Sequence, residues 1–302
     1  MTGRRGSAVA IALLCATLAT AGCGLGPGEY AGDVDLAVTR EYGAVPVLDV
    51  IVASRESDTV MRALEGVADV STRYGGGYVH SIDGVAEGQR GGDPYDWFFY
   101  VDGVESPIGA AEYDLEGEER VWWDYRNWAA TNHVPAVVGS WPAPFRDGIG
   151  GERYPVAVEC EGGGRACVAT RETLRREGAT VAPVATEKAI RVLVGPWSRV
   201  REDPVARLIE AGPVESGVFA DFEGGDLIAL DDEGGAAARL GSGAGLVAAT
   251  SRYGGLPVWV VTGGTAAAAR RASRLLDPNL LRHRYAVAVR GTATIPLPLA
   301  EP

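Results

Sequence analysis

The sequence predicts an α+β protein built from two globular units, and three observations support this prediction. The chain has 302 residues, and the part beyond the first 22 is longer than one small core normally uses. In the first half, alternating apolar runs surround a single helix-forming stretch, residues 59–65. In the second half, strand-like and helix-like stretches alternate, which is typical of an α/β sandwich.

The first 22 residues have the layout of a secretory signal peptide. Arg4 and Arg5 precede an apolar run from Ala8 to Ala21, and small residues lead up to Cys23. The run is too short, and its flanks are wrong, for a stable membrane span. We therefore predict a signal peptide at residues 1–22.

Cys23 is the predicted point of membrane attachment. The residues before it resemble the lipobox of bacterial lipoproteins, although Thr20 stands where a branched apolar residue is usual. Lipidation would supply more than one acyl chain, which suffices for stable anchoring. We therefore expect an exported protein, lipid-anchored at the outer face of the cell membrane. Soluble secretion with an unmodified Cys23 is the alternative, and the sequence does not separate Sec from Tat export.

The charge of the chain argues against nucleic-acid binding. The formal net charge is -12, and removing residues 1–22 takes away two arginines and no acidic residue, so the mature chain carries -12 - 2 = -14. A surface of this sign repels phosphate backbones. We therefore predict no nucleic-acid partner.

The cysteines indicate one disulfide. Cys15 leaves with the signal peptide and Cys23 takes the lipid, which leaves Cys160 and Cys167 close together in sequence. In an oxidising compartment such a pair predicts a local disulfide. A metal site is the alternative, but the three histidines are far apart in the chain.

The first domain is predicted at residues 34–127, after a Gly/Pro-containing tether at residues 23–33. The predicted elements are a strand pair within residues 34–53, a helix at 59–65 capped by Ser57 or Asp58, and strands at 70–74, 77–82, 97–101 and 120–125. One helix embraced by a mixed sheet is a β-grasp-like arrangement.

Residues 128–153 contain three prolines and show little periodicity, so we interpret them as an ordered arm that becomes a linker. A second domain is expected at residues 154–302. We predict its strands at 155–159, 189–194, 245–249, 257–262 and 284–289, a hairpin within 217–230, and helices at 170–177, 204–211 and 265–276. This pattern predicts an α/β sandwich-type domain.

The segment between Tyr95 and Tyr125 is rich in aromatic residues. An aromatic strand turns at Asp102-Gly103, a favoured tight-turn pair, and a later strand places Trp122 and Trp123 on opposite faces. We expect one of these tryptophans in the core and the other exposed or under the arm.

The same segment resembles the domain family found at the carboxy terminus of transcobalamin and intrinsic factor and in many bacterial surface proteins. The resemblance spans roughly residues 45 to 126. It rests on Trp97, Tyr100, Val101, Asp102, Gly103, Gly109, Ala110, Tyr113, Val121, Trp123 and Tyr125. It implies a β-grasp-type binding module and permits a corrinoid ligand, but the large helical barrel of the vitamin carriers has no counterpart here.

Aromatic residues are the candidate ligand contacts, since a flat ligand gains both burial and stacking on them. The candidates are Tyr78, Trp97, Tyr100, Gly109, Tyr113, Trp122, Tyr125, Trp128 and Trp141. Any of these tryptophans could equally be a core residue, and Trp128 and Trp141 could clamp the arm onto the sheet instead of lining a pocket. His80 and His133 are weak candidates for approaching a ligand cobalt ion.

The second domain offers two further signals. The glycine turn within Val260–Thr265 could surround an anion with backbone N–H groups, but Thr265 is equally a helix N-cap. The cluster of Arg270, Arg271, Arg274, Arg282, His283 and Arg284 is a solvated face or a docking surface for an anionic partner.

No catalytic motif stands out in the sequence, neither a Gly-x-Ser-x-Gly elbow nor a His-Glu-x-x-His run. A pair of carboxylates that only the fold brings together stays the open alternative. We therefore predict a non-catalytic, surface-anchored binding lipoprotein without a cofactor, which holds a small ligand, a corrinoid in particular, for a membrane transporter. A structural or protein-interaction role in the cell envelope is the alternative.

Overall fold

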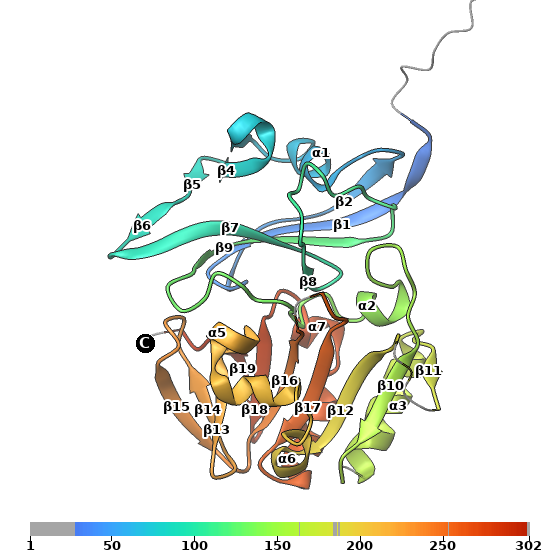
Figure 1. The fold of residues 1–302 in the computed structure, drawn as a ribbon, viewed down its shortest axis with the longest axis vertical. Helices are drawn as coiled ribbons and strands as arrows, with labels where there is room; N and C mark the ends of the chain where they lie inside the picture. The colour runs from blue at the N-terminus through green and yellow to red at the C-terminus, as the bar shows by residue number, and fades with distance from the viewer. Residues whose placement is uncertain (1–27, 163, 184–185, 187, 253, 301–302) are drawn as a thin grey trace, which may run out of the picture.

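The computed structural model describes residues 28–162, 164–183, 186, 188–252 and 254–300. The predicted signal peptide, Cys23 and residues 24–27 of the tether lie outside the described residues. The described chain forms two sheet-based layers, with the blue-to-green N-terminal half lying across one end of the yellow-to-red C-terminal half (Figure 1). Among the described residues, no helix combines the length and apolar character that a membrane crossing would require.

The N-terminal half is built on a six-stranded sheet. Its strands are, in spatial order, β2 (Val45–Arg55), β1 (Tyr30–Arg40), β9 (Arg120–Asn127), β7 (Asp93–Val101) and β6 (Gly88–Arg90), with β8 (Val104–Glu105) paired to β7. The central pair β1–β9 is parallel and the other pairs are antiparallel. The predicted strands in this half are therefore confirmed, and β1 and β2 are longer than expected.

Above this sheet lie α1 (Val60–Glu65), η1 (Tyr74–Gly76) and a small sheet of β3 (Val70–Arg73), β4 (Tyr78–Ile82) and β5 (Val85–Ala86). The helix buries Val60 and Leu64 against the six-stranded sheet, as its apolar spacing predicts. Its N-cap is Thr59, whose hydroxyl accepts from the backbone N–H of Arg62 at 3.3 Å. The prediction of Ser57 or Asp58 as the cap is wrong by one or two positions.

Strand β9 shows how the two halves meet. Trp123 and Tyr125 point into the core of the N-terminal half, while Trp122 points the other way. Both tryptophans are buried, with exposed fractions of 1% for Trp122 and 2% for Trp123. The prediction of opposite faces is confirmed. Trp122 lies under the arm, against Gly139, which is one of the two predicted alternatives. The C-terminal half also covers this face, so both tryptophans are core residues.

The predicted arm is interior. Val134 and Val137 join the core shared by the two halves, and Trp141 packs against Phe145 and Trp259 at centroid distances of 5.2 and 5.7 Å. Within the arm, α2 (Ala143–Arg146) forms a single buried turn. The segment fills space between the halves, although its prolines and low periodicity suggested a linker.

The C-terminal half is built on a seven-stranded mixed sheet. Its order is β11 (Val181–Ala182), β10 (Val156–Cys160), β12 (Ile190–Pro196), β17 (Val258–Gly263), β16 (Gly245–Thr250), β18 (Ala286–Arg290) and β19 (Ala293–Leu297). The first four strands are parallel and the last three run antiparallel to their neighbours. Nearly every residue of β16, β17 and β18 is buried, which is typical of a sheet covered on both faces.

Different elements pack against the two faces of this sheet. One face is covered by α3 (Gly164–Arg176), α6 (Ala266–Ala272), η3 (Ser273–Leu275) and α7 (Pro278–Leu281). The other face is covered by a small sheet of β13 (Ala220–Glu223), β14 (Asp226–Leu230) and β15 (Ala236–Gly241), with α4 (Trp197–Val200), η2 (Ala206–Ala211) and α5 (Pro213–Ser216). The helix expected at 204–211 is a 3₁₀ turn, and β15 and β19 were not predicted.

The predicted disulfide is present. Cys160 at the end of β10 is bonded to Cys167 in the second turn of α3, with their Cα atoms 5.7 Å apart. The bond closes the short loop between strand and helix. The chain as a whole is thus a sheet-rich α+β protein, as predicted.

Candidate functional site

The boundary between the halves contains a buried carboxylate. Asp124 of β9 is fully buried and accepts hydrogen bonds from the Thr39 hydroxyl at 2.6 Å, the Gly43 backbone N–H at 3.1 Å and the Tyr285 hydroxyl at 3.0 Å. Burial raises the pKa of Asp124 to about 7, although each of these hydrogen bonds lowers it. Because Tyr285 belongs to the C-terminal half, this carboxylate joins the two halves.

Further contacts close the boundary around Asp124. The indole N–H of Trp122 donates to the Thr39 hydroxyl at 2.8 Å, and the Tyr100 and Tyr285 hydroxyls lie 3.3 Å apart. At one margin, Arg282 pairs with Asp35 at 3.2 Å and also contacts Asp49. This part of the boundary is a buried, hydrogen-bonded core.

Arg126, two residues after Asp124, is fully buried beside this network. Its guanidinium donates to the backbone carbonyls of Thr131 at 2.8 Å and Asn127 at 3.2 Å, and it lies 3.7 Å from the centre of the Phe98 ring. Arg126 therefore holds the start of the arm against the sheet, through hydrogen bonds to backbone carbonyls and a cation–π contact with Phe98.

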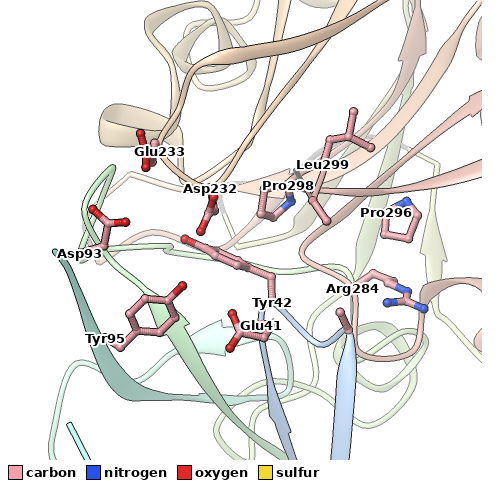
Figure 2. A pocket seen from close by; sticks show the side chains of 12 residues that line it. Glu41, Tyr42, Asp93, Tyr95, Asp232, Glu233, Arg284, Pro296, Pro298 and Leu299 are labelled. Atoms are coloured by element: carbon pink, nitrogen blue, oxygen red, sulfur yellow. The ribbon is translucent and has the colours of Figure 1, made fainter. Parts of the chain in front are cut away.

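The same boundary opens into a cleft of about 480 Å³ beside this sealed core. Figure 2 shows the side chains that line it. The lining residues are Glu41, Tyr42, Ala44, Asp93, Tyr95, Asp232, Glu233, Arg284, Pro296, Pro298, Leu299 and Ala300. A cleft of this volume, formed between two folded units and partly apolar, is the usual setting of a small-molecule site.

Four of the lining residues carry carboxylates. Glu41 is paired with Arg90 at 2.9 Å, and Asp232 accepts from the side-chain amide of Asn127 at 3.1 Å. Burial raises the pKa of Glu41, the Arg90 guanidinium lowers it, and the charge of Asp232 raises it again. This part of the cleft therefore has a negative potential.

Arg284 is the lining residue of opposite charge. It directly precedes Tyr285 and donates weakly to the backbone carbonyl of Gly43, at 3.4 Å. Burial lowers the pKa of Arg284. Among the ion pairs of the described residues, none involves Arg284, so its charge is available to a ligand.

Two tyrosines form the aromatic part of the wall. Tyr42 donates from its hydroxyl to the Asn127 carbonyl at 2.6 Å and packs edge-on against Phe219 of the C-terminal half. Tyr95 stacks on Tyr125 at 5.5 Å. Burial raises the pKa of both Tyr42 and Tyr95, so both hydroxyls are neutral donors at physiological pH.

The structure places the predicted ligand contacts elsewhere. Trp97, Tyr100, Trp122, Tyr125 and Trp141 are each at most 7% exposed, and none of the nine predicted residues is among those that line the described cleft. The structure does bring four of them together in two pairs: the ring centroids of Trp97 and Tyr125 lie 5.1 Å apart, and those of Tyr100 and Trp122 lie 5.5 Å apart.

These two pairs lie on opposite faces of the six-stranded sheet. Tyr78, Gly109 and Tyr113 are partly buried, and Trp128 is 38% exposed. Tyr78 donates to Glu87 at 2.7 Å and also contacts Asp96. Their role in ligand binding stays a prediction.

The two histidines proposed to approach a ligand metal ion lie apart from the cleft. His80 lies between Arg73, 3.2 Å away, and Glu87, 3.3 Å away. His133 contacts Glu105 at the margin of the arm. Among the described residues, no group of three or more His, Cys, Asp or Glu side chains is arranged to hold a metal ion.

Sequence reasoning missed the cleft residues, although signals for some of them were present. Asp231 forms a turn, in which its carboxylate accepts from the N–H groups of Glu233 and Gly235, and this turn presents Asp232 to the cleft. Arg284 stood in the basic cluster, which the structure divides: Arg282 pairs across the boundary, and Arg271 donates to Gly243 at 3.1 Å. The glycine turn within Val260–Thr265 leads into α6, and Thr265 is the N-cap of this helix, which is one of the two predicted roles for the turn.

A second hollow of about 260 Å³ contains the buried carboxylates Asp102 and Glu119. Asp102 accepts from the backbone N–H of Arg120 at 3.0 Å, and Glu119 accepts from that of Gly117 at 2.8 Å. Both carboxylates stabilise turns, so the cleft between the halves is the better candidate site.

Comparison with known proteins gives one family. The sequence model of a family described as Domain of unknown function (DUF4430) matches residues 57–127, which include α1 and the strands from β3 to β9. No curated protein matches the chain. The match covers part of the N-terminal half and leaves the arm and the C-terminal half without a family.

Proposed function

We propose that this chain is a surface-anchored, non-catalytic binding lipoprotein that holds a small ligand in the interdomain cleft. The observation that carries the proposal is the cleft of about 480 Å³, lined by Tyr42 and Tyr95, between halves that a buried hydrogen-bonded core fixes together. Because the walls of the cleft are held in place before binding, little free energy is lost in ordering them around a ligand, and this favours high affinity.

The location outside the cell is supported by sequence and geometry together. Lipid on Cys23 would hold β1, which begins at Tyr30, close to the membrane through residues 24–29. The Cys160–Cys167 disulfide is typical of an oxidising compartment. A membrane transporter that receives the ligand is part of the proposal.

The finer fold assignment is also proposed. The single helix α1 over a mixed sheet supports a β-grasp-like domain at residues 34–127, with an arm at 128–153 and an α/β sandwich-type domain at 154–302. The resemblance to the carboxy-terminal domains of transcobalamin and intrinsic factor supports a binding role for the first of these. A corrinoid is larger than the cleft, so it would have to bind across its mouth.

The test is a ligand screen on the full-length chain purified in detergent, read out as a shift in the unfolding temperature. The panel contains cobalamin, cobinamide, sugars, amino acids and amines. The matched control is Ala44→Trp, which fills the cleft from an exposed wall position. A compound that stabilises the natural chain and not Ala44→Trp supports the proposal. Stabilisation of neither protein by any compound contradicts it.

The second candidate is a protein-interaction role in the cell envelope. It is favoured by the edge strand β2, where Val45, Val47 and Ile51 are 37, 42 and 74% exposed. An exposed apolar edge strand can accept a strand from another chain. The test is Ile51→Lys: loss of a co-purifying envelope protein, with ligand binding unchanged, would favour this role.

A further inference from the structure

The two ends of the cleft carry opposite charges. Figure 2 shows Arg284 on the side of Pro296, and Asp93 and Glu233 on the far side of the Tyr42 ring. The charged lining residues are Glu41, Asp93, Asp232, Glu233 and Arg284. A ligand that satisfies both ends must carry a positive group and a negative group.

The Arg284 end favours a carboxylate. The guanidinium has lost part of its hydration, and its one hydrogen bond within the described chain is the weak one to Gly43. A planar guanidinium matches a carboxylate through two parallel N–H···O bonds. Leaving it without an anionic partner is costly, so an anionic ligand group gains affinity here.

The opposite end favours a positive group. Asp232 is held by the Asn127 amide, which supplies a hydrogen bond but no counter-charge. Arg90 neutralises Glu41, and the two carboxylates of Asp93 and Asp232 still outnumber the single positive charge of Arg284. A ligand with an ammonium or guanidinium group would supply the missing positive charge and hydrogen-bond donors.

The wall between the two ends suits a short alkyl chain. Tyr42 and Tyr95 present ring surface, and Pro298 and Leu299 add apolar surface from the end of the chain. Apolar methylenes gain free energy when they are removed from water against such a wall. The spacer between the charged groups is therefore expected to be apolar.

We infer that the cleft binds a free basic amino acid, with its α-carboxylate on Arg284 and its basic side chain near Asp232. This inference rests on the proposed function and names the ligand class of that site. A neutral zwitterion would leave the negative balance of the cleft uncorrected, and a plain diamine would leave Arg284 unpaired.

The experiment is calorimetric titration of the full-length chain in detergent with two probes, L-arginine and agmatine, which differ only by the carboxylate. The natural chain should bind L-arginine more tightly than agmatine, by roughly tenfold or more. Arg284→Gln should weaken L-arginine binding by a similar factor, but it should not weaken agmatine binding, because loss of a positive charge from the cleft favours this dication. Asp232→Asn should weaken both probes.

Arg274→Gln, on an exposed arginine outside the cleft, is the control and should change neither affinity. If Arg284→Gln lowers the unfolding temperature, Arg284→Lys keeps the charge and should restore part of the L-arginine affinity. Equal weakening of both probes by Arg284→Gln, or no binding of L-arginine, overturns the inference. If another panel compound binds and Ala44→Trp abolishes its binding, the proposed function stands and only the ligand class is wrong.

Discussion

The boundary between the two halves has a sealed part and an open part, and the contrast between them explains the candidate site. In the sealed part, Trp122, Asp124 and Tyr285 are each at most 2% exposed. Hydrogen bonds link Trp122 through the Thr39 hydroxyl to Asp124, which also accepts directly from the Tyr285 hydroxyl. In the open part, the same boundary leaves a cleft with charged and aromatic walls. The sealed part fixes the relative position of the halves, so the cleft exists before any ligand arrives.

The largest expected effect comes from breaking the sealed part. Trp122→Ala removes a large buried side chain and its hydrogen bond to Thr39, and should lower the free energy of unfolding by about 3–5 kcal/mol. Trp128→Ala, at a 38% exposed position, should cost less than about 1 kcal/mol. Urea unfolding of both variants measures this, and equal losses would contradict the assignment of Trp122 to a shared core.

Asp124 makes the free energy of unfolding depend on pH. Its pKa in the folded chain is about 7, above the ordinary value, so its contribution to stability is complete below about pH 4 and is lost as the pH rises through about 7. Relative to Asp124→Asn, the natural chain should lose on the order of 3 kcal/mol of stability between pH 4 and 8.

Comparing the two proteins removes the contributions of other groups. Burial also raises the pKa of Asp102 to about 7, and it lowers the pKa of His283 to about 4, which acts in the opposite direction. Both contributions are the same in the two proteins. Unfolding temperatures measured across this range should therefore fall more steeply for the natural chain, and parallel curves would count against a buried carboxylate at Asp124.

Removing the disulfide tests whether the two halves unfold as one cooperative unit. Replacing Cys160 and Cys167 by serine should cost about 2–3 kcal/mol, because the bond closes a short loop. If the sealed part joins the halves, tryptophan fluorescence and far-UV circular dichroism should still report a single unfolding transition. Two separated transitions would show that the halves unfold independently.

The smallest expected effect is at the rim of the cleft. Arg90 and Glu41 are paired with about two-fifths of each side chain exposed, so Arg90→Gln should change stability by less than about 1 kcal/mol. It should make the cleft more negative and strengthen agmatine binding by about two- to fivefold. Weaker agmatine binding in this variant would mean that Arg90 itself contacts the ligand.

The elements of the fold could largely be predicted from sequence, because each follows from local pattern. The alternation of Trp122 and Trp123 and the helix with Val60 and Leu64 needed only the periods of strand and helix. The interior position of the arm could not be predicted, since nothing local in Val137 or Trp141 shows that two halves close over them.

The site was harder to predict than the fold. Tyr42 lies in a turn after β1, Asp232 in a turn after β14, and Arg284 just before β18, so only the tertiary structure brings them together. The aromatic residues that stood out in the sequence are mainly core residues, as their size and apolar surface favour. The match to the domain of unknown function spans residues 57–127, so it includes none of these three residues.

The central claim is that the interdomain cleft binds a small molecule, and one paired titration tests it most directly. The compound with the largest stabilising effect is titrated calorimetrically into the natural chain and into Ala44→Trp. The account predicts one bound molecule per natural chain and at least about tenfold weaker binding to the filled cleft. Equal affinity for the two proteins would place the ligand elsewhere and contradict the account.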